Sequence, residues 1–235
     1  MKAFGITDIG LQRQKNEDAY LIDQDRNLFL VCDGMGGHKG GDVASRLAID
    51  TVSRHFIYNN WSEVTGALQK AIEIANQVIW DTGRHNEGVR EMGTTITAAV
   101  VSTEEIVVGH VGDSSLFIVR DNKIIKITKD HTLAEQMFKD GLLKAEEMRY
   151  NAFNHVLTRA LGVESKVKID LYHDKVQTGD WILLCSDGLT NLLENHEILA
   201  ILSIQHEPQQ AARDLISMAL SRGGHDNITI VLLRL

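Results

Sequence analysis

The chain of 235 residues contains almost no proline and little cysteine. Pro208 is its single proline, and no stretch rich in proline, glycine and serine separates one part of the chain from another. We therefore expect one domain over residues 1–235, long enough to bury a substantial core. The two cysteines, Cys32 and Cys185, each end an apolar run. Buried reduced thiols are expected there rather than a disulfide.

Long apolar segments and clusters of basic residues are missing as well. The N-terminus turns polar at Thr7-Asp8 without the apolar stretch of a signal peptide or membrane span, so we expect a cytoplasmic protein with no membrane partner. Lys and Arg number 24 against 32 Asp and Glu, a formal net charge of −8, and no basic stripe is present. Because nucleic-acid binding depends on clustered cations, no nucleic-acid partner is expected. An acidic site can still handle an anion such as phosphate if a divalent cation reverses the local charge.

The sequence does contain a series of short apolar segments that are typical of strands. The runs 28–32 and 181–185 are apolar at every position, as in strands that are covered on both faces, and each leads into an Asp-Gly pair. Strands that follow one another between residues 95 and 127 without a helix favour antiparallel hairpins, with Asp121-Asn122 as one turn. We expect strands at residues 3–7, 19–22, 28–32, 95–101, 106–111, 116–119, 181–185 and 228–233.

Three other segments favour helices. Apolar residues recur with helical spacing over residues 44–56 and 68–79. Asp42 is placed to cap the first helix, and Pro208 suits the first turn of a third helix that ends near Gly223-Gly224.

Acidic residues beside glycine stand at the ends of several predicted strands. Mg²⁺ and Mn²⁺ prefer oxygen ligands, and glycine lets a backbone carbonyl approach them. Taken singly, each Asp-Gly pair is also consistent with an ordinary turn. However, Asp33, Asp187 and Asp226 border strongly apolar strands, where uncompensated charge is costly. Together these three residues favour a metal cluster.

Other phosphate-handling sites do not fit the sequence. His38-Lys39-Gly40 lacks the Gly-Lys-Ser/Thr order of a Walker loop, and a dinucleotide motif that began at Gly34 would need glycine where Lys39 stands. Neither cysteine precedes an arginine-closed phosphate loop or is flanked by cations, so thiol catalysis is disfavoured.

Eight motifs, in order along nearly the whole chain, resemble the PP2C (PPM) protein phosphatases, and specifically their compact bacterial members. They are TDIGLQRQKNED (7–18), VCDGMGGH (31–38), MGTT (92–95), GHVGDS (109–114), DHT (130–132), LTRALG (157–162), LCSDGL (184–189) and GHDNIT (224–229).

The resemblance implies an α+β fold, a two-sheet antiparallel β-sandwich flanked by α-helices in four αββα layers. It also implies hydrolysis of phosphoserine and phosphothreonine by a metal-activated water. By motif, Asp33 would bridge two Mn²⁺ or Mg²⁺ ions, Asp187 and Asp226 would hold the first, and the Gly34 carbonyl would help to hold the second.

Further roles follow from the same resemblance. Glu17 and Asp18 would act through metal-bound water, and Asp113 with Asp187 would hold a possible third ion. Arg13 resembles the phosphate-binding arginine, whose planar fork suits two phosphate oxygens. His38 resembles the residue that protonates the leaving oxygen.

Substrate choice and partners are less directly indicated. Bacterial relatives carry a variable flap beside the cleft at about residues 139–155, although this polar stretch is also consistent with an ordinary exposed helix and turn. The resemblance implies phosphorylated proteins as substrates, a cognate eukaryotic-type Ser/Thr kinase as a partner, and a monomer. One alternative is a catalytically silent pseudophosphatase that binds phosphoproteins, but the complete set of Asp33, Asp187 and Asp226 argues against it. Another is a carboxylate-metal nuclease, which is disfavoured because the sequence has no basic groove for DNA.

Overall fold

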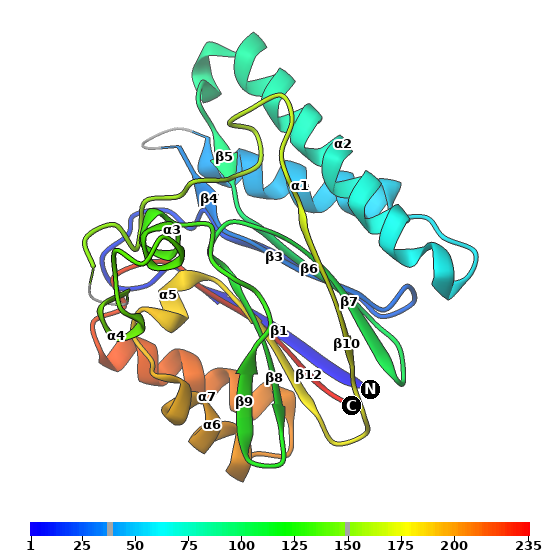
Figure 1. Cartoon of the computed structure of the whole chain (residues 1–235), viewed down its shortest axis with the longest axis vertical. Coiled ribbons are helices and arrows are strands. Elements are labelled where there is room, and N and C mark those ends of the chain that lie inside the picture. Colours follow the sequence, from blue (N-terminus) through cyan, green and yellow to red (C-terminus); the bar gives the residue numbers. More distant parts are fainter. Residues whose placement is uncertain (37–39, 149–150) are drawn as a thin grey trace.

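The fold is a four-layer sandwich of helices and antiparallel sheets (Figure 1). The computed structural model describes residues 1–36, 40–148 and 151–235. Two five-stranded sheets lie face to face, and helices cover the outer face of each. The α+β class and the two-sheet antiparallel β-sandwich flanked by α-helices are confirmed.

Every paired strand in the two sheets is antiparallel to its neighbour. The first sheet has the order β1 (Lys2–Asp8), β12 (Ile228–Arg234), β11 (Trp181–Cys185), β8 (Ser115–Arg120) and β9 (Lys123–Lys126). The second has the order β10 (Asp170–Lys175), β7 (Glu105–Val111), β6 (Ile96–Val101), β3 (Leu28–Cys32) and β2 (Ala19–Asp23). A small ladder joins β4 (Gly34–Met35) to β5 (Gly93–Thr94).

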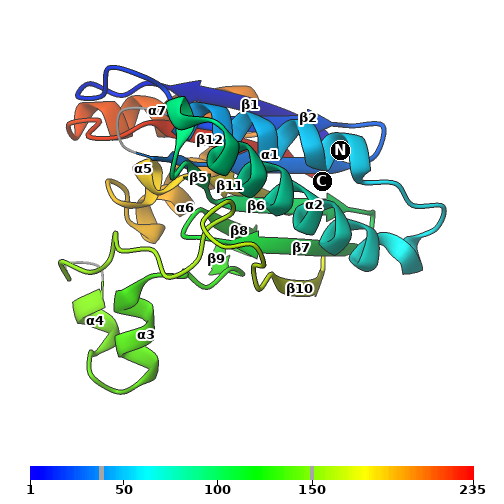
Figure 2. The ribbon, with the colours of Figure 1, turned by 90° about the horizontal axis from the view of Figure 1, so that it is seen from above.

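The helices fall into three groups. The second sheet is covered by α1 (Gly41–His55) and α2 (Val64–His85), which are flanked by the 3₁₀ turns η1 (Trp61–Glu63) and η2 (Glu87–Val89). The first sheet is covered by α5 (Asp187–Thr190), α6 (Asn195–Ile204) and α7 (Pro208–Ser221). The remaining pair, α3 (Leu133–Lys139) and α4 (Ala145–Met148), projects from the body of the molecule (Figure 2).

Three hydrophobic cores separate the four layers. Along β3, Phe29 and Val31 face the core between the sheets, whereas Leu28, Leu30 and Cys32 face α1 and α2. The same alternation occurs along β11. Both fully apolar strands are therefore covered on both faces, as predicted. Both cysteines are buried and free, which confirms the expected thiols.

The eight predicted strands are all present, with ends that agree within one residue. Asp121 and Asn122 have positive φ angles of 49° and 57° and form the predicted hairpin turn between β8 and β9. Sequence patterns implied β9 only through the hairpin turn before it, and they missed β10 and the two-residue strands β4 and β5. Both β9 and β10 lie at sheet edges and expose much of their length to solvent. Such strands lack the apolar run on which strand prediction depends.

The helix predictions were correct in position but wrong in one cap. Pro208 opens α7, which ends just before Gly223 and Gly224. The N-cap of α1 is Gly40, so Asp42 lies inside the first turn and does not cap the helix. Its negative charge still suits the positive end of the helix dipole. Within the described part of the chain, every helix is too short or too polar to span a bilayer.

Candidate active site

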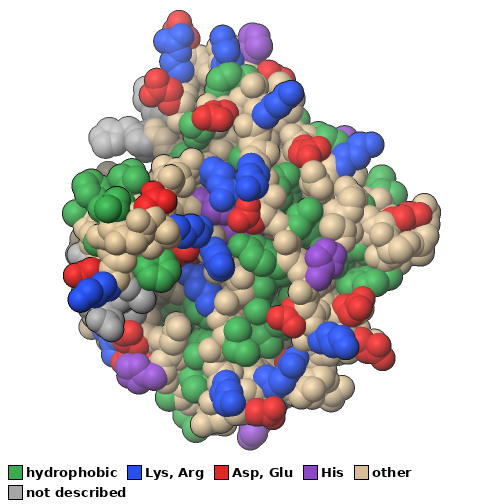
Figure 3. Space-filling view, viewed as in Figure 1, with side chains coloured by type: hydrophobic (Ala, Val, Ile, Leu, Met, Phe, Trp, Pro, Cys, Tyr) green, Lys and Arg blue, Asp and Glu red, His purple; other side chains and the backbone are tan. Residues whose placement is uncertain are grey.

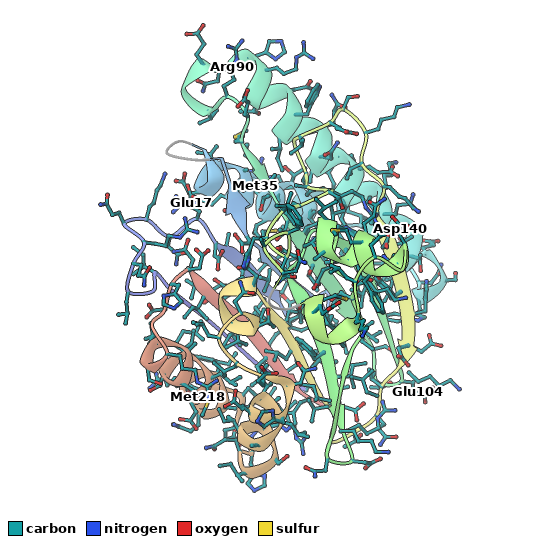
Figure 4. The ribbon with its side chains drawn as sticks, turned by 60° about the vertical axis from the view of Figure 1, so that its left-hand side comes forward. Glu17, Met35, Arg90, Glu104, Asp140 and Met218 are labelled. Carbon is teal, nitrogen blue, oxygen red and sulfur yellow. The ribbon has the colours of Figure 1, made fainter. Side chains whose placement is uncertain are left out.

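One cavity lies where several strand ends and loops meet, and its volume is about 800 Å³. The contributing segments are the β1–β2 loop, the ends of β3 and β11, the β7–β8 loop and the loop before β12. Figure 4 shows Glu17 and Met35, two of its lining residues, near the amino end of α1. Seven of the nine predicted site residues line this cavity: Arg13, Glu17, Asp33, Gly34, Asp113, Asp187 and Asp226.

The other two predicted residues have different positions. Asp18 is only 8% exposed, and its Oδ2 accepts a hydrogen bond from Ser186 Oγ at 2.8 Å. It therefore belongs to the buried support behind the cavity. His38 lies outside the described residues, so its role as a proton donor stays a prediction.

Two aspartates lie within two residues of the ends of buried strands. Asp33 comes after β3, and its backbone N–H donates to Thr95 Oγ1 at 2.9 Å, while its carbonyl accepts from Thr95 N at 2.8 Å. Asp187 is the first residue of α5, and its Oδ2 accepts from Asn191 Nδ2 at 3.0 Å. Rigid strands thus fix where both carboxylates enter the cavity.

Asn227 joins the β1–β2 loop, which carries Arg13 and Glu17, to the loop before β12, which carries Asp226. Its Nδ2 donates to Ile9 O at 2.9 Å and to Lys15 O at 3.0 Å, and its Oδ1 accepts from Glu17 N at 2.8 Å. The residue is 5% exposed. One buried amide therefore holds the loop with Arg13 and Glu17 against the loop with Asp226.

Gly34 lies where three backbone segments meet. A Cβ atom here would stand 2.2 Å from Gly41 O and 2.5 Å from Glu17 O, which no side chain could tolerate without a backbone shift. Glycine is therefore required for the β3–β4 segment to approach the amino end of α1.

The cavity concentrates negative charge in a poorly solvated place. Burial raises the pKa of Asp18 to about 7, although hydrogen bonds from Thr229 and Ser186 oppose the shift and nearby carboxylates add to it. Burial and then repulsion from neighbouring aspartates raise the pKa of Asp33 and Asp113 well above the usual range. Burial also raises the pKa of Glu17. A bound cation would offset the repulsion between these carboxylates and favour their charged forms.

The residues present fit a divalent cation. Asp18 Oδ1 and Asp187 Oδ1 are buried and have no hydrogen-bond partner among the described residues. The predicted donors are all oxygens, as Mn²⁺ and Mg²⁺ prefer. The carboxylates line the cavity, but they do not yet converge on one point. Within residues 1–36, 40–148 and 151–235, no three His, Cys, Asp or Glu side chains are placed to hold a metal ion together. Side-chain rotation would be needed for them to close around an ion.

Arg13 faces one of the predicted metal ligands. Its Nη2 donates to Asp226 Oδ2 at 2.6 Å, and its side chain remains 52% exposed. The guanidinium is therefore held at the cavity edge by a carboxylate, where it remains accessible to an anion.

Sequence reasoning missed three polar residues of the site. Asn191 lies one helical turn after Asp187, a four-residue spacing that the sequence could have revealed. His155 lines the cavity with Nδ1 3.8 Å from Asp187 Oδ2, a contact that raises its pKa. Asn227 lies within the GHDNIT motif, but its role depends on tertiary contacts that the motif does not show. His155 also depends on a tertiary contact, and it lies in none of the eight motifs.

The pKa of Asp18 gives a stability prediction. Its folded value of about 7 exceeds its ordinary value of 3.8, so between these limits the folded state keeps a proton that the unfolded state has lost. Stability of the chelator-treated protein should therefore fall as pH rises, by about 1 kcal/mol between pH 6 and 8 from this group. Thermal unfolding at pH 6 and pH 8 should show this loss of stability. Added Mn²⁺ should stabilise the protein more at pH 8 than at pH 6.

Asp18→Asn should remove the contribution of Asp18 to this pH dependence, because the amide does not titrate, while Asp33 and Asp113 keep theirs. Asp50→Asn, at an exposed position of α1, is the matched control and should keep the drop. The same slope in both variants would contradict the assignment.

Comparisons with known proteins agree with this geometry. The family profile described as "Protein phosphatase 2C" matches residues 11–220. The serine/threonine phosphatase stp of Listeria monocytogenes serotype 4b (strain F2365) is 35% identical over 238 residues, covering 96% of this chain and 92% of that protein. The protein phosphatase PhpP of Streptococcus pneumoniae (strain ATCC BAA-255 / R6) is 30% identical over 233 residues, covering 97% of this chain and 94% of its own.

Solved structures show the same fold. The Mycobacterium tuberculosis serine/threonine phosphatase PstP/Ppp matches with a TM-score of 0.93 and 32% identity, covering 100% of this chain and 98% of that one. The catalytic domain of PstP in complex with two manganese ions matches with a TM-score of 0.88 and 32% identity, covering 98% and 96%. Since the sequence, the fold and the acidic cavity agree over nearly the whole length, the chain belongs to the protein phosphatase 2C family.

Proposed function

We propose that this chain is a metal-dependent phosphatase that hydrolyses phosphoserine and phosphothreonine in proteins. The acid-lined cavity, with two buried carboxylate oxygens that lack partners among the described residues, is the observation that carries the proposal. The names of its relatives, which are serine/threonine phosphatases, support the substrate class.

The metal ligands are proposed from the residues that line the cavity. Asp33 would bridge two Mn²⁺ or Mg²⁺ ions, Asp187 and Asp226 would complete the first site, and the Gly34 carbonyl would contribute to the second. Asp113 with Asp187 would hold a third ion. When bound, such ions supply positive charge that activates water and screens the phosphate. The related PstP structure with two manganese ions supports the two core sites.

Glu17 and Asp18 are proposed to orient the water around the metals. The Glu17 carboxylate lies against Gly41 at the amino end of α1, where the helix dipole favours negative charge. Ser186 fixes one oxygen of Asp18 and leaves the other without a partner among the described residues. The free oxygen can accept a hydrogen bond from such a water.

Arg13 is proposed to bind the phosphate. Within the described residues the one hydrogen bond of Arg13 runs from Nη2 to Asp226. It uses one of the two Nη2 hydrogens, so the other can pair with an N–H of Nε or Nη1 on the same edge of the guanidinium and donate to two phosphate oxygens. Asp226 would thus orient the arginine as well as hold a metal.

Arg13→Ala should lower kcat/KM for a phosphothreonine peptide by about 10- to 100-fold, because a hydrogen bond to a charged group is lost. Arg13→Lys should recover only part of this loss, since lysine lacks the planar fork. Steady-state kinetics with Arg54→Ala, an exposed arginine of α1, as the control would check this. Full recovery by lysine would argue against two-oxygen recognition.

The assay of the main proposal compares three reactions of the purified protein. Phosphate release from a phosphothreonine peptide should require Mn²⁺ and stop with chelator, and DNA should remain intact. Asp187→Ala should lower peptide turnover by at least about 100-fold, since a metal ligand is lost. Peptide binding without turnover would favour the pseudophosphatase, and DNA cleavage would favour the nuclease. Full activity of Asp187→Ala would refute the metal assignment.

We further propose that the flap selects the substrate. Residues 132–157, which include the predicted 139–155 and which we call the flap, leave and re-enter the body through a bridge between Thr132 and Leu157. The flap carries α3 and α4 away from the sandwich (Figure 2). Its His155 lines the main cavity and an adjoining one of about 220 Å³. A phosphorylated segment that enters the cavity would therefore pass close to it.

The flap also exposes apolar side chains that could contact such a segment. Phe138, Leu142 and Phe153 are 39%, 69% and 43% exposed. Hydrophobic side chains are visible over this part of the molecule, at the left of the face in Figure 3. Exposed apolar groups next to a polar cavity are typical of a surface that binds protein.

Replacing residues 139–155 with a short Gly-Ser loop should lower kcat/KM for a phosphopeptide by about 10-fold or more. Turnover of a small aryl phosphate, which reaches only the cavity, should change by less than about threefold. Equal losses on both substrates would defeat the flap proposal. The opposing eukaryotic-type kinase and the monomeric state remain predictions from the sequence.

A further inference from the structure

The Asp130-His131-Thr132 motif has no role in the proposed chemistry. His131 is 2% exposed and lies between β9 and the flap. Its backbone N–H donates to Gly112 O at 2.8 Å, and Gly112 N–H donates to His131 Nδ1 at 3.0 Å. The backbone and the ring of one histidine thus hold both polar groups of one glycine, an arrangement we call the Gly112 clasp.

The Gly112 clasp fixes the backbone immediately before Asp113. Gly112 has a φ of 111°, and a Cβ atom here would stand 2.5 Å from Thr95 Cβ, so its conformation requires glycine. On the other side of Asp113, Ser114 O accepts from Thr97 Oγ1 at 3.0 Å, and Ser114 Oγ lies 2.8 Å from Thr95 Oγ1. Asp113 therefore stands between two clamped neighbours.

The tautomer of His131 follows from the clasp. Because the Gly112 N–H points at Nδ1, this nitrogen is the acceptor and the ring proton belongs on Nε2. Nε2 lies 3.3 Å from Asp170 Oδ2, too poorly aligned for a good hydrogen bond, so the attraction is mainly electrostatic. Asp170 is fixed in turn by Arg159 Nη1, which donates to its Oδ1 at 2.7 Å. The carboxylate behind the ring thus favours the tautomer that the clasp needs.

His131 also belongs to the root of the flap. Its carbonyl accepts from Thr158 N at 2.7 Å, and the next residue, Thr132, pairs with Leu157. The same histidine therefore connects the flap root to the backbone beside Asp113.

We propose that His131 is a positioning residue for Asp113. The Gly112 clasp sets where the Asp113 carboxylate stands in the cavity, and Asp170 with Arg159 supports the ring from outside. This inference rests on the proposed role of Asp113 as a metal ligand. A histidine that merely stabilised the fold would affect stability without acting through Asp113.

Two substitutions separate these cases. In His131→Asn, the side-chain oxygen can take the place of Nδ1 and accept from Gly112. In His131→Leu, the volume is largely kept but the acceptor is lost, which leaves a buried N–H unpaired.

Binding of Mn²⁺ to the protein alone is the first measurement, by titration with detection of free Mn²⁺ in electron paramagnetic resonance. Asp113→Asn and His131→Leu should each weaken the weakest class of sites by about 10-fold. His131→Asn should stay within about twofold of the unaltered protein. Unchanged binding in His131→Leu would overturn the proposal.

A double-mutant cycle is the second measurement, with kcat/KM for a phosphothreonine peptide as the readout. His131→Leu should lower this value by about 10-fold alone but by less than about twofold in the Asp113→Asn background. Equal fold losses in both backgrounds would show that His131 does not act through Asp113.

The controls keep the possible failures apart. If Asp113→Asn changes neither Mn²⁺ binding nor kcat/KM, the role of Asp113 fails and this inference fails with it, whereas Mn²⁺-dependent phosphate release would still support the phosphatase.

If circular dichroism shows that His131→Leu does not fold, Asp170→Asn takes its place in the cycle. It should show the same dependence on Asp113 with a loss of about threefold, and equal losses in both backgrounds would overturn the proposal.

Discussion

Mutual repulsion among buried carboxylates is the constraint on which the rest of this structure depends. Burial and neighbouring aspartates raise the pKa of Asp18, Asp33 and Asp113, and the charges stand at the ends of strands that cannot move apart. Such a cluster opposes folding unless cations compensate it. The stability of the sandwich must therefore come from its three apolar cores.

The polar residues around the cavity serve to hold repelling groups in place. Asn227 ties two loops together with all three hydrogen bonds of its amide that the structure shows, and Ser186 holds Asp18. Thr95 links the backbone of Asp33 to Ser114, beside Asp113. Because each of these supports is buried and hydrogen-bonded, the carboxylates are presented at fixed points, as a preorganised site requires.

The sequence allowed much of this to be predicted, for identifiable reasons. Strands such as β3 and β11 are apolar on both faces, so their position and their Asp-Gly ends were visible without a structure. The edge strands β9 and β10 carry no such pattern. Asp42 fitted the preferences for a cap, but the helix begins at Gly41, two residues earlier than a cap at position 42 would need.

The residues of the site also differ in whether the sequence revealed them. Seven of the predicted residues line the cavity. Asp33 and Asp187 are marked locally as acidic residues next to glycine at strand ends, whereas Arg13 and Glu17 could be placed only through the family motifs. Asn227, His131 and His155 could not be given roles, because their partners lie far away in the sequence. Asp18 was found by its motif, but its place behind the cavity wall could be seen only in three dimensions.

The polar character of the edge strands β9 and β10 bears on how a substrate is recognised. Many domains bind an extended peptide by adding it as a further strand to an open sheet edge. Here β9 begins and ends with lysine, and β10 places Asp174 and Lys175 at exposed positions, so both edges discourage strand addition. At these two edges a phosphorylated chain would find no backbone ladder to fix its register, which agrees with the proposal that its side chains are recognised at the cavity and the flap.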